Sequence, residues 1–524
     1  MAKCVAISVA TLTGWLVAAA AAAQAPAFEI QHYAFEGAHV LSESRLQALV
    51  APFVGPQRSM DDVARAVAAV KAAYVAAGYP IVQVYAPEQT VHSGSVLVRV
   101  TEGQLVKVEL AGLQAYSAAN IRASLPPLRE GEAPNTAALV AAVLLANDNP
   151  AKQLAVNFSA GSSAAEVQAR VDVDEDRIRK LGLSLDNAGN SATGRERIGL
   201  SYQHANLWDR DHVLSLQLMT SVEQPGKAAS LTGGYRIPFY QAGLTLDLVA
   251  AYSDNKSDAV SAAGPLFFSG KGVYAGLRLN QALASRGDYR HKLVYGIDYK
   301  DFKNSCSIAG IVLDACGTIT DIPLSLAYQG QLAKRTYQWG VGLSYFHNLP
   351  GGPHGQAERY GTRPRSWQAL RGSAYLNLPF ADWQWRTTVN GQYSNSALIP
   401  AEQFGAGGAT SVRGYDERTA AADRGLMANL ELYTPELAAT LGLARRHSLR
   451  ALLFYDAAWL RNSDAAALAA SHLASVGLGV RYALDKSASL RCDAGATQVA
   501  TPPGVSAARV PNRGFVHLSF QYAY

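Results

Sequence analysis

From about Arg179 to the C-terminus, hydrophobic and polar residues alternate with a period of two. In the run 291–300, one face would carry Leu293, Tyr295, Ile297 and Tyr299, and the other Lys292, Gly296, Asp298 and Lys300. Such runs are about ten residues long, with aromatic residues near their ends, whereas strands of soluble sandwiches usually have about five or six residues. Because backbone groups in lipid must be paired within the protein, only a closed sheet is tolerated there. The alternation therefore predicts a membrane-spanning β-barrel.

The length of this region limits the number of strands. Residues 179–524 provide chain for roughly 14–18 tilted strands of about 9–11 residues, with 16 antiparallel strands as our expectation. The last run places Phe520, Tyr522 and Tyr524 on one face and ends on an aromatic residue. Such a final strand is typical of outer-membrane barrels, so we expect these aromatic residues to serve membrane assembly, with the barrel-assembly machinery as a partner during biogenesis.

The N-terminus has the composition of an export signal. Lys3 is its only charge, an apolar core runs from Cys4 to Val17, and the small residues Ala21–Ala23 provide a cleavage site. The alternative, a transmembrane anchor, lacks the basic flank that stops transfer. Residues 1–23 are therefore predicted to be a signal peptide.

Two αβ units are predicted between the signal and the barrel. Residues 27–102 and 103–178 repeat the order β-α-α-β-β, each over about 75 residues. In the first unit, Ser59 and Asp62 form a capping-box pair before a helix, and Gly78 can end that helix in the left-handed conformation. The fold class is therefore α+β repeats followed by an all-β barrel.

Composition and motifs exclude several functions. The net charge of +5 is mild and gives no reason to expect a nucleic-acid partner. The chain lacks G-x-S-x-G, H-E-x-x-H and G-x-x-x-x-G-K-[ST], and its 11 histidines have no metal-ligand spacing. An enzyme is not expected, and neither catalytic residues nor a cofactor is predicted.

One acidic cluster raises the question of a cation site. Residues Asp172, Asp174, Glu175 and Asp176 could bind Ca²⁺, or they could form the solvated end of a strand at the junction with the barrel. We favour the solvated strand end and expect no metal.

Three cysteines remain after removal of the signal. Cys306 and Cys316 bracket a short insert and could form a disulfide in an oxidising compartment, or stay as free thiols. Cys492 has no evident partner and is expected within a strand.

A long connection interrupts the barrel at about residues 396–423. It is far longer than the usual hairpin loop of about two to five residues, so it is either functional or disordered. Phe404, Val412 and Tyr415 are apolar anchors that a disordered loop does not need. Four glycines, Gly405, Gly407, Gly408 and Gly414, allow positive φ and close approach to a wall. We expect the connection to fold into the barrel and Arg413 to pair with a carboxylate of the wall.

Three stretches of the sequence resemble a known family. The stretch EQFGAGGATSVRGYDE resembles its G-G-x-x-S-V-R-G-Y/F element, carried here by Gly407, Gly408, Ser411, Val412, Arg413, Gly414 and Tyr415. A second stretch is similar to a D-N-x-G…T-G signature, carried by Asp186, Asn187, Gly189, Thr193 and Gly194. The third, LLFYDAAWL, is similar to an F-x-D-x-G strand in which Phe454 and Asp456 match but Ala458 replaces glycine.

The family is that of the two-partner secretion transporters (TpsB, the haemolysin-activation/filamentous-haemagglutinin transporter type). It belongs to the POTRA-bearing superfamily that includes the BamA-like assembly factors. The resemblance covers nearly the whole mature chain, and the D-N-x-G…T-G signature narrows it to the secretion branch. It implies that Arg413 reaches Asp456 across the lumen; the alternation agrees, because it turns Phe454 and Asp456 inward.

The resemblance also implies a function. The αβ units would be periplasmic POTRA domains that receive an unfolded client by β-augmentation. The client would be a cognate exoprotein, recognised by its N-terminal secretion domain and passed through a barrel in the lipid of a Gram-negative outer membrane. Family members often carry an N-terminal plug helix; here Phe28 opens the first αβ unit soon after the cleavage site, so we expect no such helix. The alternatives are a BamA-like assembly factor and a passive porin.

Overall fold

The computed structural model describes all residues except 1–26, 92–93, 164, 190–193, 226–228, 255–257, 262–263, 268–270, 304–305, 309–310, 314–317, 464–470 and 502–510. It divides into two compact parts, which differ from the two αβ units. The first part extends to Lys107 and includes Glu130–Ala137 and Ala160–Gln168. The second part comprises Val108–Arg129, Ala138–Ser159 and Ala169–Tyr524. Within the described residues, no helix combines the length and apolarity needed to cross a bilayer.

The first αβ unit contains the predicted elements and one additional pair of strands. Its elements are β1 (Phe28–Ile30), β2 (His32–Glu36), α1 (Glu43–Val50), η1 (Ala51–Phe53), β3 (Gly55–Arg58), α2 (Met60–Ala76), β4 (Val82–Tyr85) and β5 (Ser95–Glu102). The main sheet has the order β2-β5-β4, and β1 pairs with β3. Ser59 and Asp62 form the expected capping box at α2, and Gly78 has a φ of +94°. The pair β1–β3 was not expected, because GPQR carries no alternation.

The second αβ unit repeats the main sheet. Its elements are β6 (Gln104–Ala111), α3 (Ala118–Ser124), α4 (Thr136–Ala146), β7 (Lys152–Ala160) and β8 (Glu166–Glu175), with the sheet order β6-β8-β7. In both sheets, the last strand of the unit pairs with the first and the preceding strand lies at an edge. Ser117 caps α3 by accepting a hydrogen bond from the backbone N–H of Asn120.

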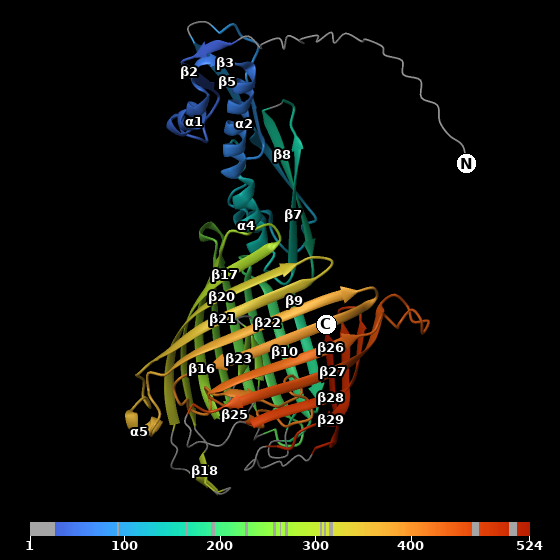
Figure 1. The fold of residues 1–524 in the computed structure, drawn as a ribbon. Coiled ribbons are helices and arrows are strands. Elements are labelled where there is room, and N and C mark those ends of the chain that lie inside the picture. Colours follow the sequence, from blue (N-terminus) through green and yellow to red (C-terminus); the bar gives the residue numbers. More distant parts are fainter. Residues whose placement is uncertain are drawn as a thin grey trace, which may run out of the picture. The chain divides into compact units, whose positions relative to one another are not determined.

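The remaining chain closes into a barrel of sixteen antiparallel strands, which confirms the predicted fold class (Figure 1). The strands are β9 (Arg179–Asp186), β10 (Arg197–Leu207), β11 (His212–Ser221), β12 (Ser230–Phe239), β13 (Leu244–Asp254), β16 (Lys271–Ala282), β17 (Tyr289–Lys303), β20 (Thr318–Ala333), β21 (Gln338–Leu349), β22 (Gln368–Phe380), β23 (Trp383–Tyr393), β26 (Arg424–Tyr433), β27 (His447–Arg461), β28 (Ser471–Leu484), β29 (Ala488–Thr497) and β30 (Gly514–Ala523).

Short elements lie in the connections of the barrel. They are η2 (Tyr240–Ala242), the pair β14 (Asp258–Ser261) and β15 (Gly264–Phe267), the pair β18 (Cys306–Ile308) and β19 (Ile311–Leu313), α5 (Ala357–Tyr360), and the pair β24 (Phe404–Ala406) and β25 (Ala420–Ala422). The barrel has one end with short turns, such as that between β10 and β11, and one end with long connections. We call them the short-turn end and the long-loop end.

Alternation along the strands separates a lipid face from a polar interior. On β27, Leu453 and Tyr455 are exposed on the outer face, whereas Phe454 and Asp456 are almost completely buried inside. On the final strand, Val516, Leu518 and Tyr522 are exposed in the same way. The inner face is therefore the place where charged residues can be concentrated without contact with lipid.

Candidate functional site

The connection between β23 and β26 lies inside the barrel. We call residues 394–423 the luminal segment. It contains the small β24–β25 hairpin, and its Ala406, Val412, Arg413 and Tyr415 side chains are almost fully buried. A cavity of about 870 Å³ remains between the segment and the inner wall. The luminal segment is therefore the main candidate for a functional site.

The Arg413 side chain ends among three carboxylates of the wall. Its Nε donates to Asp456 Oδ2 at 2.7 Å and its Nη2 to Asp456 Oδ1 at 2.7 Å. Its Nη1 donates to Glu431 Oε1 at 3.0 Å and lies 3.4 Å from Asp493 Oδ1. The guanidinium lies 3.6 Å from the ring centroid of Phe454. The Arg413 side chain is only 4 % exposed, so water screens this group, the Arg413 cluster, very little.

The backbone of the segment follows the wall closely beside this cluster. The backbone N–H of Arg413 also donates to Asp456, and Gly414 N–H donates to His517 Nε2 at 3.1 Å. Gly414 has a φ of +91°, and a Cβ there would collide with the ring of Phe515. Glycine is required at this position for both reasons.

The prediction of positive φ applies to three of the four glycines. Gly407, Gly408 and Gly414 have φ values of +108°, +122° and +91°. Gly405 does not use this freedom, because it belongs to β24 and pairs with Ala421 in extended backbone.

Apolar residues of the segment complete the packing. Val412 and Tyr415 are buried in one cluster with Ala406 and Ala458. The Tyr415 hydroxyl donates to the carbonyl oxygens of Ala474 at 3.0 Å and Val499 at 2.6 Å. Ser411 Oγ accepts from Gly407 N–H within the turn. Ala458, which replaces the usual glycine, is fully buried beside these side chains.

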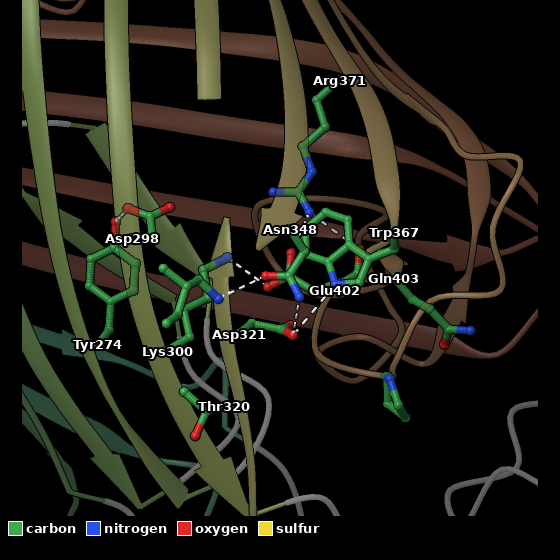
Figure 2. Close-up of polar contacts among 12 residues, drawn as sticks. Tyr274, Asp298, Lys300, Thr320, Asp321, Asn348, Trp367, Arg371, Glu402 and Gln403 are labelled. Atoms are coloured by element: carbon green, nitrogen blue, oxygen red, sulfur yellow. Dashed lines mark hydrogen bonds and ion pairs between the residues drawn. The ribbon is translucent and has the colours of Figure 1, made fainter. Parts of the chain in front are cut away.

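A second charged group holds the N-terminal part of the luminal segment. Figure 2 shows Glu402 between Lys300 of β17 and Arg371 of β22, with Lys300 Nζ 2.6 Å from Oε1 and Arg371 Nη2 2.8 Å from Oε2. Gln392 Nε2 donates to the Glu402 carbonyl at 3.0 Å, and Gln392 Oε1 accepts from Arg371 Nε at 2.7 Å. We call Glu402, Lys300 and Arg371 the Glu402 cluster. The Glu402 side chain is 2 % exposed, whereas Lys300 and Arg371 are 16 % and 32 % exposed.

Apolar and polar contacts surround the Glu402 cluster. Leu398 and Ile399 of the segment are buried in one apolar cluster with Tyr360 and Trp367. The buried carboxylate of Asp321, labelled in Figure 2, accepts from Asn348 Nδ2 at 3.1 Å, from Trp367 Nε1 at 3.5 Å and from the Tyr360 hydroxyl. The segment is thus attached to two parts of the wall by charges of opposite sign.

Asp186 and Asn187 of the D-N-x-G…T-G signature lie at the seam between the first and last strands. Asn187 Nδ2 donates to Val516 O at 3.0 Å, and Asn187 Oδ1 accepts from Leu518 N–H at 2.9 Å. Asp186 Oδ1 accepts from Ala188 N–H at 2.9 Å. These contacts extend the pairing of β9 with β30 beyond its last paired residue, Asp186.

The two glycines of this signature lie where a larger side chain would collide with neighbouring atoms. Gly189 N–H donates to the carbonyl of Arg195, and a Cβ on Gly189 would collide with the carbonyl of Gly194. Gly194 has a φ of +94°. Thr193, the other member of the signature, lies outside the described residues.

A buried ion pair connects the second αβ unit with a turn of the barrel. Lys152 Nζ lies 2.5 Å from Asp211 Oδ2, and both side chains are at most 1 % exposed. Lys152 Nζ also donates to Asn120 Oδ1 at 3.2 Å, and the Tyr240 hydroxyl donates to Asp211 Oδ2 at 2.6 Å. Burial lowers the pKa of Lys152, and the Asp211 carboxylate opposes this effect.

The acidic residues at the same junction do not converge on a cation. Asp172 accepts from Arg170 and Asn157, whereas Glu175 accepts from the N–H groups of Gln114 and Ala115. The N–H of Arg177 and the side chain of Lys180 lower the pKa of Asp176 to about 2. Within the residues that the structure describes, no group of three or more His, Cys, Asp or Glu side chains could hold a metal.

The remaining predicted residues lie elsewhere. Cys316 is outside the described residues, so its disulfide with Cys306 stays a prediction, while Cys492 is a free thiol in β29. Tyr522 and Tyr524 are exposed on the outer face of the final strand, and Phe520 shares that face.

Sequence reasoning did not find the Glu402 cluster or the Lys152–Asp211 pair. The signals were present, since Glu402 directly precedes the glycine-rich stretch and alternation places Lys300 on the inner face. The partners of these charges, however, lie far away in sequence, on strands whose positions around the barrel the alternation does not specify.

Comparison with known proteins gives one family for most of the chain. The family model described as haemolysin secretion/activation protein ShlB/FhaC/HecB matches residues 166–482, and a model of the ShlB-type POTRA domain matches residues 28–103. The outer membrane transporter CdiB of Dickeya dadantii is 22 % identical over 419 residues, covering 77 % of this chain and 72 % of that protein. The heme/hemopexin transporter protein HuxB of Haemophilus influenzae is 22 % identical over 422 residues, covering 77 % and 70 %. The solved structure of CdiB from Escherichia coli has the same fold, with a TM-score of 0.76 at 19 % identity over 96 % of this chain and 92 % of that one.

Proposed function

The chain belongs to the haemolysin secretion/activation protein family ShlB/FhaC/HecB, and from this premise we propose that it exports one cognate, unfolded exoprotein through its barrel. It is an outer-membrane transporter of the two-partner secretion type and carries a POTRA domain. The family consists of transporters, so the chain is not an enzyme. The short-turn end, which the αβ units adjoin in the chain, is the periplasmic end.

The αβ units, acting as POTRA domains, receive the client from the periplasm. In each main sheet the shorter partner of the hairpin, β4 or β7, lies at an edge. An edge strand offers unpaired backbone groups to an extended peptide of any sequence, while neighbouring side-chain pockets give selectivity. This mode of recognition suits a client that must remain unfolded until it has crossed the membrane. We expect the client's N-terminal secretion domain to bind first.

The observation that carries the proposal is the luminal segment inside a closed barrel. A barrel with an internal obstruction needs a mechanism for opening, and a barrel that only passes small solutes does not need the αβ units. The segment is attached at the Arg413 cluster and at the Glu402 cluster. We propose that the arriving client displaces it at one or both places, after which the cavity beside it becomes continuous across the membrane.

The seam bears on the assembly-factor alternative. A BamA-like factor releases its clients sideways between the first and last strands, which requires that seam to open. The side chain of Asn187 adds two hydrogen bonds across the seam at the long-loop end. This additional closure supports export through the lumen over lateral insertion.

The test is secretion of an exoprotein from cells that express the intact transporter. The candidate client is a large, repetitive exported protein, sought among the products of the genes next to that of the transporter, and its amount in the medium is measured. Wild type is compared with Arg413→Ala, with Asp456→Ala, with both together, and with a deletion of residues 27–178. We expect secretion to be lost in the deletion and strongly reduced in each single variant, while folded barrel remains in the outer membrane. Normal secretion by both single variants would reject the role of the Arg413 cluster, and secretion by the deletion variant would reject the role of the αβ units.

A further inference from the structure

The outer face of the barrel carries a repeated pair of side chains at its periplasmic end. His212 Nδ1 lies 2.6 Å from the Tyr235 hydroxyl, His291 Nδ1 3.2 Å from the Tyr328 hydroxyl, and His447 Nδ1 2.8 Å from the Tyr482 hydroxyl. In each pair the histidine is within the first three residues of a strand, β11, β17 or β27.

The three pairs share one register. The tyrosine is opposite the residue two positions beyond the histidine, and that residue is a leucine each time. The paired residues are Leu214 and Tyr235, Leu293 and Tyr328, and Leu449 and Tyr482. A polar pair followed by leucine on the lipid face marks the level at which headgroups give way to hydrocarbon.

The His212–Tyr235 pair, on β11 and β12, also has an aromatic and a basic neighbour. Trp208 is 71 % exposed, and its ring meets those of His212 and Tyr235 edge to face, at 6.0 and 6.3 Å between centroids. The exposed side chain of Arg210 interacts electrostatically with both His212 and Tyr235. Tryptophan, tyrosine and basic residues are the side chains that membrane proteins place among lipid headgroups.

The acidic residues of the turn between β10 and β11 already have partners within the protein. Asp211 pairs with buried Lys152 and accepts from Tyr240. Asp209 accepts from the Asn206 side chain at 3.0 Å and from Ser117 N–H at 3.3 Å. The turn therefore directs its carboxylates toward the second αβ unit and leaves Arg210 to attract an anion at the surface.

An apolar groove on the lipid face adjoins Tyr235. It has a volume of about 600 Å³, within the usual range of about 300–1,000 Å³ for ligand pockets, and its lining includes Leu214, Gly233, Leu248, Ala250 and Ala275. Gly233 pairs with Ala250, and Ala250 pairs with Ala275, so the wall is thin across three neighbouring strands. The other two histidine–tyrosine pairs are not part of this lining.

We propose that this part of the outer wall binds one anionic phospholipid of the periplasmic leaflet. The phosphate is held by Arg210, His212 and Tyr235 beside the ring of Trp208, and one acyl chain lies in the groove over Gly233. Attraction between Arg210 and the headgroup selects anionic lipid, whereas burial of apolar surface in the groove distinguishes a lipid from free phosphate. The other two pairs contact headgroups at the same level without a specific chain site. The site is independent of the secreted client.

Native mass spectrometry of the intact transporter in mild detergent tests the proposal. Phosphatidylglycerol, phosphatidylcholine and inorganic phosphate are titrated separately. We expect one tightly held phosphatidylglycerol, weaker phosphatidylcholine, and no displacement of the lipid by inorganic phosphate. The headgroup variant Arg210→Ala/His212→Ala and the groove variant Gly233→Leu should each weaken retention about ten-fold or more.

A matched control uses another glycine of the lipid face. A side chain at Gly233 meets only the tip of Leu216 and a backbone oxygen at ordinary contact distances, and at Gly372 only a backbone oxygen at 4.0 Å. Both leucine variants should therefore fold, as checked by heat-dependent migration in gels, and Gly372→Leu should retain lipid like wild type. Equal loss in both leucine variants, full displacement by inorganic phosphate, or no retained phospholipid in wild type would each overturn the proposal.

Discussion

The two clusters that attach the luminal segment use opposite charges in different surroundings. At the Arg413 cluster, a cation of the segment lies among carboxylates of the wall, and Asp456 is completely buried. At the Glu402 cluster, a carboxylate of the segment lies between cations of the wall that are 16 % and 32 % exposed. Partners that remain in contact with water keep part of their hydration when the pair separates. The comparison indicates that the Glu402 side of the segment is easier to release than the Arg413 side.

The largest effect is expected for the Arg413 cluster. Arg413→Ala leaves the buried Asp456 carboxylate without its cationic partner, although Asn429 Nδ2 still donates to it at 2.8 Å, and should destabilise the docked segment by about 3–5 kcal/mol. Arg413→Lys keeps the charge but loses the two-point pairing, so its effect should be smaller. Proteinase K cleavage within the luminal segment of the folded barrel reports the population of the released state. If Arg413→Ala were cleaved no faster than wild type, the cluster would not hold the segment.

A smaller effect is expected for the Glu402 cluster. Glu402→Ala leaves Lys300 and Arg371 without their carboxylate partner but partly hydrated, and should destabilise the docked segment by about 1–3 kcal/mol. The same cleavage assay measures the change, and single-channel conductance in a planar bilayer should show more frequent opening. The control is Thr410→Ala, an exposed residue of the same segment outside both clusters. An effect of Glu402→Ala equal to that of Arg413→Ala would contradict the difference in hydration.

The smallest expected quantity is the coupling between the clusters. They share no residue, so the effects of Arg413→Ala and Glu402→Ala should add to within about 0.5 kcal/mol in a double-mutant cycle. A larger coupling would mean that loss of one cluster changes the strength of the other, and the comparison of two independent attachments would then have to be replaced.

The features that sequence predicted correctly depend on local regularities. Alternation alone predicted that Asp456 and Phe454 point inward and that Leu453 and Tyr455 point outward, because successive side chains of a strand lie on opposite faces. The capping pair Ser59–Asp62 was equally visible, since both residues lie within one turn of the chain. The fold class followed from such patterns, whereas the family was indicated by the resemblance of three motif stretches.

The features that sequence missed depend on closure of the barrel. Glu402 meets Lys300 and Arg371 only because β17 and β22 present their inner faces to the same region of the lumen. Lys152 meets Asp211 only because the second αβ unit adjoins one particular turn. Gly405 is a further example. It lies in a glycine-rich stretch, yet it is part of a regular hairpin because it pairs with Ala421, which is distant in sequence.

The luminal segment leaves the barrel wall from β23 and returns to it on β26, and these two strands pair directly with each other. The two ends of the segment are therefore neighbours at the long-loop end. The hydrogen bonds between β23 and β26 are the same whether the segment lies inside or outside the barrel. Withdrawal requires no strand to separate and no change in the circumference of the barrel. In the proposed export cycle, the lumen therefore opens and closes while the ladder between β23 and β26 stays intact.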